Sequence, residues 1–274
     1  MGFPWTCFPV GRRLARPVRG GESMTTTIGI AGITGRMGRL LTEEVAAVGA
    51  TLAGGTSRDG SGGFTDIAAL AAASDVVIDF TNAGLAQDHA KAMAAAGKPW
   101  VLGTSGLSDA DEAAVAAGAE HVPVVYAANF ATGVNLVLAM AERMAAALPA
   151  AEYDAEIVEM HHRQKVDAPS GTAIGMGRAV AKGRLQVFAD VMESGRHGHT
   201  GARKPGSIGF AALRGGQVVG EHSLIFAAGA EQIVLTHRAF DRRAFASGAV
   251  RAALWVSGRP AGLYSMMDVL GMST

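Results

Sequence analysis

The chain has 274 residues, which is enough to bury a substantial core in one large domain or two smaller ones. Its 24 Lys and Arg balance 24 Asp and Glu, so there is no overall basic field of the kind that attracts nucleic acid or an anionic membrane. No apolar stretch is long enough to cross a bilayer, and the single cysteine, Cys7, excludes an intramolecular disulfide, so we expect a cytoplasmic protein without nucleic-acid or membrane partners.

Residues 1–23 differ from the rest of the chain. Four arginines stand among Gly and Pro in this stretch, and Glu22 is its only acid. An Arg-rich, acid-poor leader is typical of a transit peptide, and two adjacent arginines weakly resemble a twin-Arg signal, but no apolar segment follows them. We interpret the stretch as a disordered or spurious extension with Met24 as the natural start, and a targeting segment is the alternative.

From Thr27 onward, short apolar runs alternate with amphipathic segments. Strands are expected at Thr27–Ala31, Leu52–Gly55, Asp75–Phe80, Pro99–Gly103 and Pro123–Ala128, and helices at Met37–Val48, Ala83–Ala96 and Asp109–Ala119. Strands that alternate with helices predict a parallel sheet covered on both faces. Because such crossovers are right-handed, the sheet should be doubly wound and Rossmann-like.

The pattern changes after Asn129. Further strands are expected at Tyr153–Met160, Ser207–Arg214, Gln217–His222, Leu224–Ala227 and Gln232–His237, and helices at Val134–Leu148 and Arg242–Val256. The two glycines within Arg214–Gln217 predict a hairpin between the strands that flank them. Several strands with little helix between them predict a second, α+β domain with a mixed or antiparallel sheet.

The expected domain boundaries follow from these two patterns. Residues 24–131 should form a dinucleotide-binding domain that residues 240–274 complete, because the last amphipathic helix can return to the first sheet. Residues 132–239 should form a substrate-binding and oligomerisation domain.

A glycine-rich loop joins the first expected strand to the first expected helix. Gly32, Gly35 and Gly38 have the spacing GxxGxxG, a variant of the dinucleotide fingerprint. Gly32 permits a sharp exit from the strand, Gly35 lets the backbone approach a pyrophosphate, and Gly38 lets helix and sheet pack closely. The phosphates then meet unpaired amides at a helix N-terminus. Glycine packing without a ligand is the alternative reading, but the position between strand and helix favours a nicotinamide dinucleotide.

The end of the second expected strand bears on the choice of cofactor. Arg58 is positioned for a 2′-phosphate, and Arg36 in the glycine loop could join it. Asp59 could instead bind an unphosphorylated ribose if the strand ended one residue later. The sequence therefore predicts NADPH as the preferred cofactor, with NADH as the alternative. Three further strand ends, Asp79–Thr81, Gly103–Gly106 and Ala128–Phe130, could contact the cofactor or could be ordinary turns.

Polar chemistry is concentrated between Glu159 and Thr172. Two histidines, an arginine and a lysine fall within five residues, followed by Pro-Ser-Gly-Thr at an expected helix start, where the serine is a suitable N-cap. Gly171 and Thr172 offer free amides to an anion, and His161 and Lys165 can exchange protons near neutrality. The segment predicts a carboxylate-binding site with acid–base chemistry, and a solvated basic loop is the alternative.

A metal site is a further alternative. It would draw on His161, His162, His197 and His199, but these have no regular ligand spacing and no cysteine accompanies them. We therefore predict no metal.

The chain resembles the 4-hydroxy-tetrahydrodipicolinate reductase (dihydrodipicolinate reductase) family. The segment Ala31–Arg39 resembles its cofactor loop, and Glu159–Thr172, with His-His-Arg-x-Lys-x-Asp-Ala-Pro-Ser-Gly-Thr, resembles its signature. Further matches lie at Gly198–Gly201, Gly220–His222 and Gly248–Trp255, so that the likeness extends from Thr26 to Leu270. The central signature is far more specific than the glycine loop alone.

This resemblance implies an NAD(P)H-dependent oxidoreductase that reduces 4-hydroxy-tetrahydrodipicolinate to tetrahydrodipicolinate, with loss of water, in lysine and diaminopimelate biosynthesis. It implies that His161 is the proton donor and acceptor and Lys165 a proton donor, and that His162, Gly171 and Thr172 hold the substrate's carboxylates. The implied cofactor contacts are Gly32, Ile33, Thr34, Gly35, Arg36, Met37, Arg58, Gly103, Thr104, Ser105, Ala128, Asn129, Phe130 and Ala131.

The resemblance also implies a homotetramer built through the sheet of the second domain. The chain departs from the family at Ser57, which stands where an acidic ribose-binding residue is expected, and this departure agrees with a preference for NADPH. The stretch Asp59–Thr65 is shorter than in familiar members, which should trim a loop.

Other functions explain the sequence less well. An aldehyde dehydrogenase of the aspartate-semialdehyde type needs a cysteine thiolate, and Cys7 lies in the extension. Sugar or polyol dehydrogenases share the expected architecture, but they do not account for a carboxylate-binding segment. A nucleotide-binding protein without catalysis does not account for the His161 and Lys165 pair.

Overall fold

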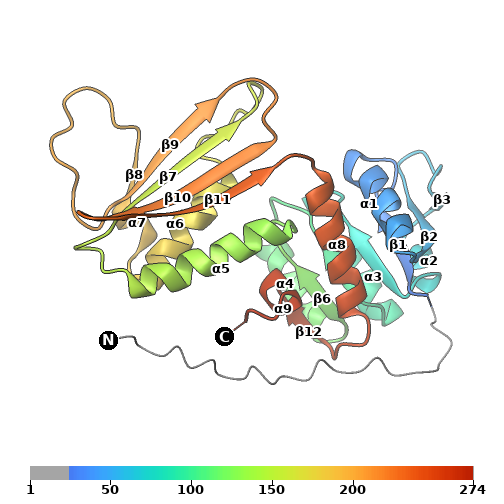
Figure 1. Ribbon diagram of the computed structural model, residues 1–274. Coiled ribbons are helices and arrows are strands. Elements are labelled where there is room, and N and C mark those ends of the chain that lie inside the picture. The colour runs from blue at the N-terminus through green and yellow to red at the C-terminus, as the bar shows by residue number, and fades with distance from the viewer. Residues whose placement is uncertain (1–24, 274) are drawn as a thin grey trace, which may run out of the picture.

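The computed structural model describes residues 25–273, which form two sheets with their helices at opposite ends of the molecule (Figure 1). The interpretations of residues 1–23, of Cys7 and of Met24 concern residues outside this range. Within it, no helix has both the length and the apolar character needed to cross a membrane.

The first sheet has seven strands, all parallel, in the order β12-β6-β5-β4-β1-β2-β3. Its strands are β1 (Thr27–Ala31), β2 (Thr51–Thr56), β3 (Gly63–Phe64), β4 (Val76–Asp79), β5 (Trp100–Leu102), β6 (Pro123–Tyr126) and β12 (Gly262–Tyr264). Its helices are α1 (Arg36–Ala47), α2 (Ile67–Ala72), the 3-10 turn η1 (Ala83–Leu85), α3 (Ala86–Ala96), α4 (Asp109–Ala119), α8 (Arg243–Val256) and α9 (Met266–Val269). The C-terminal segment thus adds both a covering helix and an edge strand to this sheet.

Alternate residues of each central strand enter two different cores. In β4, Val76 and Ile78 pack with α1 and α8, whereas Val77 packs on the opposite face with α2, α3 and α4. All of these side chains are fully buried. A strand that is buried on both faces must be continuously apolar, which is why these short runs could be recognised in the sequence.

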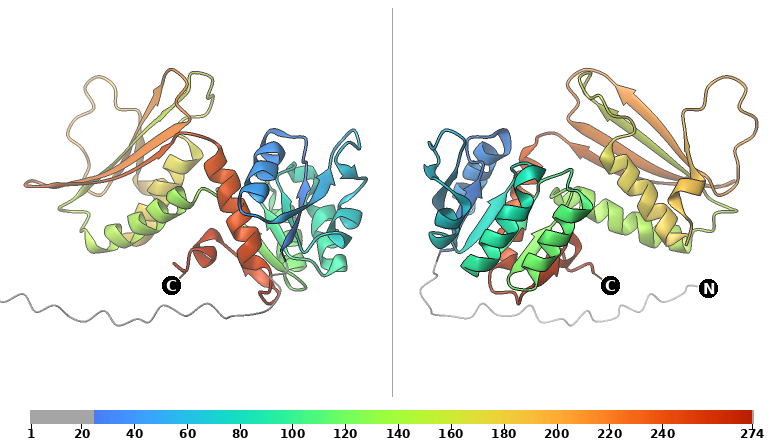
Figure 2. Two further views of the ribbon diagram at one scale, coloured as in Figure 1. Left: turned by 45° about the vertical axis from the view of Figure 1, so that its right-hand side comes forward. Right: turned by 180° about the vertical axis from the view of Figure 1, so that it is seen from behind.

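The second sheet has five strands in the order β11-β10-β7-β9-β8 and is mixed. Its strands are β7 (Asp154–His161), β8 (Met192–Ser194), β9 (Ile208–Arg214), β10 (Gly220–Ala227) and β11 (Gln232–Ala239), and its helices are α5 (Thr132–Ala147), α6 (Gly171–Gly183) and α7 (Phe188–Val191). Strand β10 is antiparallel to β7 and β11, while β9 is parallel to β7 and β8. Helices α5 and α6 cover one face of this sheet (Figure 2). The predicted fold class, a Rossmann-like sheet with a second α+β unit, is confirmed.

The predicted hairpin at the two glycines is wrong. Strands β9 and β10 flank the turn but do not pair, because β7 lies between them. The turn crosses the end of β7 instead: Gly215 N donates to His161 O at 2.9 Å, and His162 N donates to Val218 O at 2.7 Å. The two strands expected on either side of Ser223 are one strand, β10. A tight turn indicates a reversal of the chain, but it does not indicate which strand fills the space between its arms.

Candidate active site

The carboxyl ends of β2, β1, β4, β5 and β6 lie side by side along one edge of the first sheet, where ligands bind in such folds. The glycine loop is fastened to this edge, because the amides of Gly32 and Ile33 both donate to Thr56 O, at 3.1 and 3.0 Å. Gly35 is the N-cap of α1. A Cβ atom on Gly38 would lie 2.4 Å from the carbonyl oxygens of both Gly32 and Ile33. Loop and helix are therefore packed as closely as a dinucleotide fingerprint requires.

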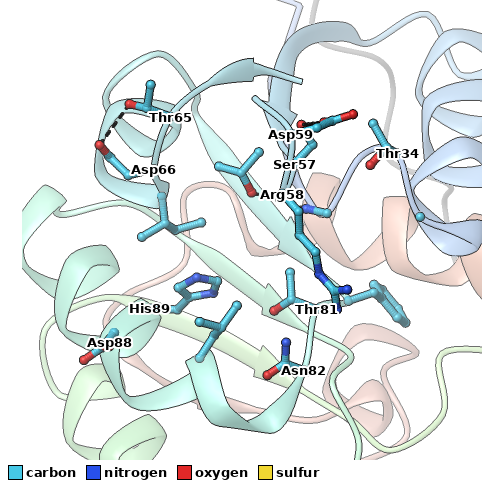
Figure 3. A pocket seen from close by; sticks show the side chains of 16 residues that line it. Thr34, Ser57, Arg58, Asp59, Thr65, Asp66, Thr81, Asn82, Asp88 and His89 are labelled. Atoms are coloured by element: carbon cyan, nitrogen blue, oxygen red, sulfur yellow. Dashed lines mark hydrogen bonds between the residues drawn. The ribbon is translucent and has the colours of Figure 1, made fainter. Parts of the chain in front are cut away.

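A pocket of about 780 Å³ opens between the glycine loop, the end of β2 and the start of α3 (Figure 3). This volume is within the usual range for small-molecule sites. Of the predicted cofactor residues, Gly32, Thr34, Gly35 and Arg58 line it. Phe80 and Thr81, from a strand end that the sequence offered as a possible cofactor contact, also line it, as do Asn82, Asp88 and His89, which the sequence did not suggest.

Two charged side chains follow β2 with different roles. The Asp59 carboxylate accepts hydrogen bonds from the hydroxyls of Ser61 and Ser57, both at 2.7 Å, which lower the pKa of Asp59 to about 2. Asp59 is thus an anion held within its own turn. The exposed Arg58 side chain extends across the pocket toward Thr81 (Figure 3). Arg58 rather than Asp59 is free to reach a ligand there.

A buried pair that the sequence did not reveal holds the pocket wall in place. Asp79, 1% exposed at the end of β4, accepts hydrogen bonds from the amide and hydroxyl of Thr81, at 3.0 and 2.7 Å. Its other oxygen lies 2.6 Å from Nδ1 of His89 on α3. The pair fixes the turn after β4 against α3, and only the folded chain brings the two residues together.

The other predicted cofactor residues do not line this pocket. Ile33 and Met37 pack against the first core, and Arg36 is exposed at the start of α1. Phe130 is buried and makes an edge contact with Phe80, at 5.5 Å between ring centroids. The remainder, Gly103, Thr104, Ser105, Ala128, Asn129 and Ala131, follow β5 and β6 and continue the same sheet edge toward the second sheet.

Asn129 links the candidate cofactor residues of the first sheet to the signature segment beside the second sheet. Its Nδ2 donates to Thr172 Oγ1, at 3.4 Å, and its Oδ1 accepts from the Ala131 amide, at 2.8 Å. Asn135 on α5 in turn donates to the Asn129 carbonyl, at 2.9 Å. These bonds hold the loop after β6, at the sheet edge where the cofactor is expected, beside the first turn of α6. That turn contains Gly171 and Thr172 of the signature segment.

The signature segment begins with a buried carboxylate and a histidine on the helix-facing side of β7. Glu159 is 1% exposed and His161 is 8% exposed, and Glu159 Oε2 lies 2.6 Å from His161 Nδ1. Arg214 donates to both oxygens of Glu159, at 2.8 Å each, and the Ser170 amide donates to Oε1, at 3.1 Å. Burial raises the pKa of Glu159, but hydrogen bonds from Arg214 and His161 outweigh it and hold the pKa below its usual value. Glu159 is therefore an anion inside the protein.

Ser170 is the N-cap of α6, as expected from the sequence. Its Oγ accepts a hydrogen bond from the Ala173 amide, at 3.2 Å, and forms a second hydrogen bond with His222 Nε2, at 2.8 Å. The ring of His222 makes an edge contact with that of His161, at 5.0 Å between centroids. Burial, and next the charge on His161, lower the pKa of His222 to about 4. His222 is thus neutral near pH 7.

The other two charged or polar residues of the segment have different environments. The Lys165 ammonium donates to both carboxylate oxygens of Asp167, at 2.8 Å each. Nδ1 of His162 is buried without a hydrogen-bond partner in the described residues. Within that same range, no group of three or more His, Cys, Asp or Glu side chains gathers as a metal site.

The low pKa of His222 predicts that folding is sensitive to acid. Below pH 6.5 the unfolded chain protonates this histidine, whereas the folded chain does so only near pH 4. The free energy of unfolding should therefore fall as the pH drops through this window, by up to about 3 kcal/mol from His222. Urea unfolding at several pH values should show a shallower dependence in His222→Gln than in the unaltered chain. An equally steep dependence in both would contradict this account.

Comparisons with known proteins agree with this arrangement. The family model for the N-terminal part of dihydrodipicolinate reductase matches residues 26–130, and the model for its C-terminal part matches residues 133–270. The chain belongs to the dihydrodipicolinate reductase family. A 4-hydroxy-tetrahydrodipicolinate reductase of Granulibacter bethesdensis is 69% identical, over 89% of this chain and 97% of that protein. The corresponding protein of Acidiphilium cryptum is 63% identical, with the same coverage of both chains.

Solved structures share the fold. A dipicolinate-bound dihydrodipicolinate reductase from Paenisporosarcina sp. TG-14 has a TM-score of 0.71 at 24% identity, covering 89% of this chain and 99% of that one. A probable dehydrogenase from Thermotoga maritima has a TM-score of 0.56 at 12% identity, covering 90% of this chain and 93% of that one. These structures support the fold, while the family models and the curated relatives confirm the assignment to an NAD(P)H-dependent reductase of lysine and diaminopimelate biosynthesis.

Proposed function

We propose that this chain reduces 4-hydroxy-tetrahydrodipicolinate to tetrahydrodipicolinate and uses NADPH in preference to NADH. The observation that carries the proposal is the hydrogen bond from Asn129 to Thr172, which joins the carboxyl edge of the first sheet to the start of α6. A nicotinamide at that edge would lie beside the signature segment and its acid–base residue, His161.

The cofactor would extend along the sheet edge. Its adenosine end would occupy the pocket beside Arg58, and its pyrophosphate would meet the backbone at the glycine loop, Gly32 to Met37. Its nicotinamide end would lie at the ends of β5 and β6, near Gly103–Ser105 and Ala128–Ala131. Helix α1 packs tightly on the loop, because a Cβ atom on Gly38 would lie 2.4 Å from the carbonyl oxygens of Gly32 and Ile33, and this close packing would hold the loop backbone in place for such a group. The reduced nicotinamide, when bound, supplies the hydride.

The substrate's carboxylates would bind at the N-terminus of α6 and at His162. Ser170 uses its cap on the Ala173 amide, so the amides of Gly171 and Thr172 stay available to an anion. Nδ1 of His162 is buried without a hydrogen-bond partner in the described part of the chain. This supports a role for His162 as a hydrogen-bond donor to a substrate carboxylate. When substrate binds, the Lys165 ammonium would leave the Asp167 carboxylate and contact the substrate instead.

The chemistry follows from this placement. Once the 4-hydroxyl group has left as water, the cyclic imine is conjugated and C4 is electrophilic. A hydride adds to C4, the electron pair moves through the ring toward the imine, and one proton from the protein completes the reduction. His161 supplies that proton from Nε2, because its Nδ1 is held by Glu159, and the Lys165 ammonium would then restore the proton that His161 has given up. The reaction balances, because the substrate loses one water molecule and gains one hydride and one proton.

Arg58 should set the preference for NADPH. Arg58→Ala removes the cation proposed to face the 2′-phosphate, and a hydrogen bond to a charged group contributes about 1.5–3 kcal/mol. We expect kcat/KM for NADPH to fall by about tenfold to a hundredfold, with little change for NADH. Initial rates with each cofactor measure this effect, and Arg39→Ala, on the exposed side of α1, is the matched control. A strong preference for NADH that Arg58→Ala leaves unchanged would contradict the proposal.

We also propose that the chain works in the cytoplasm as a homotetramer assembled through the second sheet. Leu213 and Val234 are exposed large apolar side chains on that sheet, on the face away from α5 and α6, which supports an interface there. In this proposal each domain has its own role. Residues 24–131 with 240–274 bind the dinucleotide, and residues 132–239 bind the substrate and form the contacts between subunits. Analytical ultracentrifugation tests the assembly, and a monomer at micromolar concentration would overturn it.

The proposed reaction has a direct test. The enzyme that forms 4-hydroxy-tetrahydrodipicolinate would supply the unstable substrate in the same vessel, and NADPH consumption would be followed. We expect oxidation of NADPH only when both enzymes and their substrates are present. No oxidation in the complete mixture, with folded protein, would refute the proposed function.

A further inference from the structure

Glu159 is a buried charge that the proposed proton transfer uses only to occupy Nδ1 of His161. It lies two residues before His161 on the same face of β7 and contacts Nδ1 of that ring at 2.6 Å. An anion at this depth is costly unless it is neutralised. Arg214, on the neighbouring strand β9, meets both of its oxygens at 2.8 Å. The arrangement thus keeps a charge inside the protein directly behind the proposed proton donor.

We propose that Glu159 and Arg214 form a positioning couple that orients His161 and sets the electrostatic field on its imidazole. This inference rests on the proposed function, because it assigns a role relative to His161. Glu159 accepts the Nδ1 proton, which leaves Nε2 as the nitrogen that exchanges a proton with substrate. Arg214 holds the carboxylate in that orientation and offsets part of its charge.

The surroundings of Nε2, on the side of the His161 ring opposite Glu159, agree with this role. A Cβ atom on Gly220 would lie 3.0 Å from His161 Nε2, so a glycine there leaves room beside this nitrogen. His222 borders the ring and is held by Ser170, which occupies its Nε2. Within the described residues, His161 therefore has Nδ1 bound by a carboxylate and Nε2 without a hydrogen-bond partner.

The titratable groups around His161 come from several elements. Glu159 lies on β7, Arg214 on β9 and His222 on β10, His237 on β11 lies beside His222 at 6.5 Å between ring centroids, and the loop after β7 contributes Lys165 with Asp167. Burial keeps His222 and His237 neutral near pH 7, since it lowers the pKa of each. Of the carboxylates, Glu159 contacts the ring. Removing its charge should disfavour a protonated His161, whereas removing the Arg214 charge should favour one.

The test is the pH dependence of kcat in two variants. In Glu159→Gln we expect kcat to fall about tenfold to a hundredfold, less than the ~10²–10⁴ expected for losing a general acid. Its alkaline limb, where the proton donor is lost, should move to lower pH by about one unit. In Arg214→Gln the alkaline limb should move to higher pH. If the two residues had only a structural role, the alkaline limbs of the two variants would not move in opposite directions.

Controls separate this inference from the proposed function. Glu156→Gln, on the same strand and also paired with arginines, Arg196 and Arg203, should leave the pH profile unchanged. Arg214→Lys retains a cation and replaces Arg214→Gln if the latter does not fold, with a smaller shift of the same sign. Full activity in His161→Asn would remove the proposed role of His161 as proton donor, and no NADPH oxidation by the unaltered chain would remove the proposed function itself. An inactive His161→Asn together with unshifted limbs in folded Glu159 and Arg214 variants would overturn the positioning couple alone.

Discussion

Replacing His161 with asparagine should lower kcat by about 10²–10⁴ and leave the affinity for NADPH nearly unchanged. The imidazole is the proposed proton donor, and because its Nδ1 is bound by Glu159, Nε2 is the nitrogen that would give the proton to substrate. The cofactor loop and pocket lie on the first sheet and do not depend on this side chain. Lys165→Ala should also lower kcat while cofactor binding persists.

Steady-state kinetics in the coupled assay would measure this loss, and NADPH fluorescence titration would measure the affinity. His121→Asn, an exposed histidine that follows α4, is the matched control and should behave as the unaltered protein does. Near-normal turnover in both His161→Asn and Lys165→Ala would remove the proposed proton-transfer chemistry.

Gly38→Ala should raise the Kd for the dinucleotide by about tenfold or more and should also destabilise the fold by about 1–3 kcal/mol. The added carbon would lie 2.4 Å from the carbonyl oxygens of Gly32 and Ile33, and neither backbone group can move without opening the loop. The amides that should meet the pyrophosphate would then be displaced.

Calorimetric titration with NADPH, together with thermal unfolding, measures both effects. Gly229→Ala is a matched control, because a Cβ atom there would meet open space in the turn between β10 and β11. Tight NADPH binding by a Gly38→Ala protein of unchanged stability would show that the loop does not pack as closely as described.

The first sheet could be predicted well because its central strands are buried on both faces. A run such as Val76–Asp79 is apolar throughout, and each run is followed by a helix that returns the chain to the same edge. The glycine loop was recognisable for the same local reason, since it lies directly between β1 and α1. The short strands β3, β8 and β12 were not predicted because, unlike the equally short β5 with its fully buried Trp-Val-Leu run, they are only partly buried and not continuously apolar.

The second sheet shows the limit of local patterns. The glycines at 215 and 216 predicted a hairpin, but β7 lies between the two strands and takes hydrogen bonds from both. That insertion depends on β7 having apolar residues, Ala155 and Ile157, that pack beneath α6. Nothing within the turn itself carries this information.

The candidate site divides in the same way. The signature segment and the Ser170 cap could be predicted because their residues are adjacent in sequence. The pairs that stabilise the site join residues far apart: Arg214 to Glu159 and Ser170 to His222, 55 and 52 residues apart. Asp79 and His89 are ten residues apart and meet only because β4 and α3 pack together. A single sequence gives no signal for such partners.

The central claim is that a dicarboxylate ring is held between the nicotinamide end of the cofactor and the signature segment. A crystal structure with NADPH and pyridine-2,6-dicarboxylate tests it most directly. We expect one carboxylate at the amides of Gly171 and Thr172, with the ring between His161 and the ends of β5 and β6. A dicarboxylate bound at full occupancy elsewhere, with this position filled by solvent, would contradict the account.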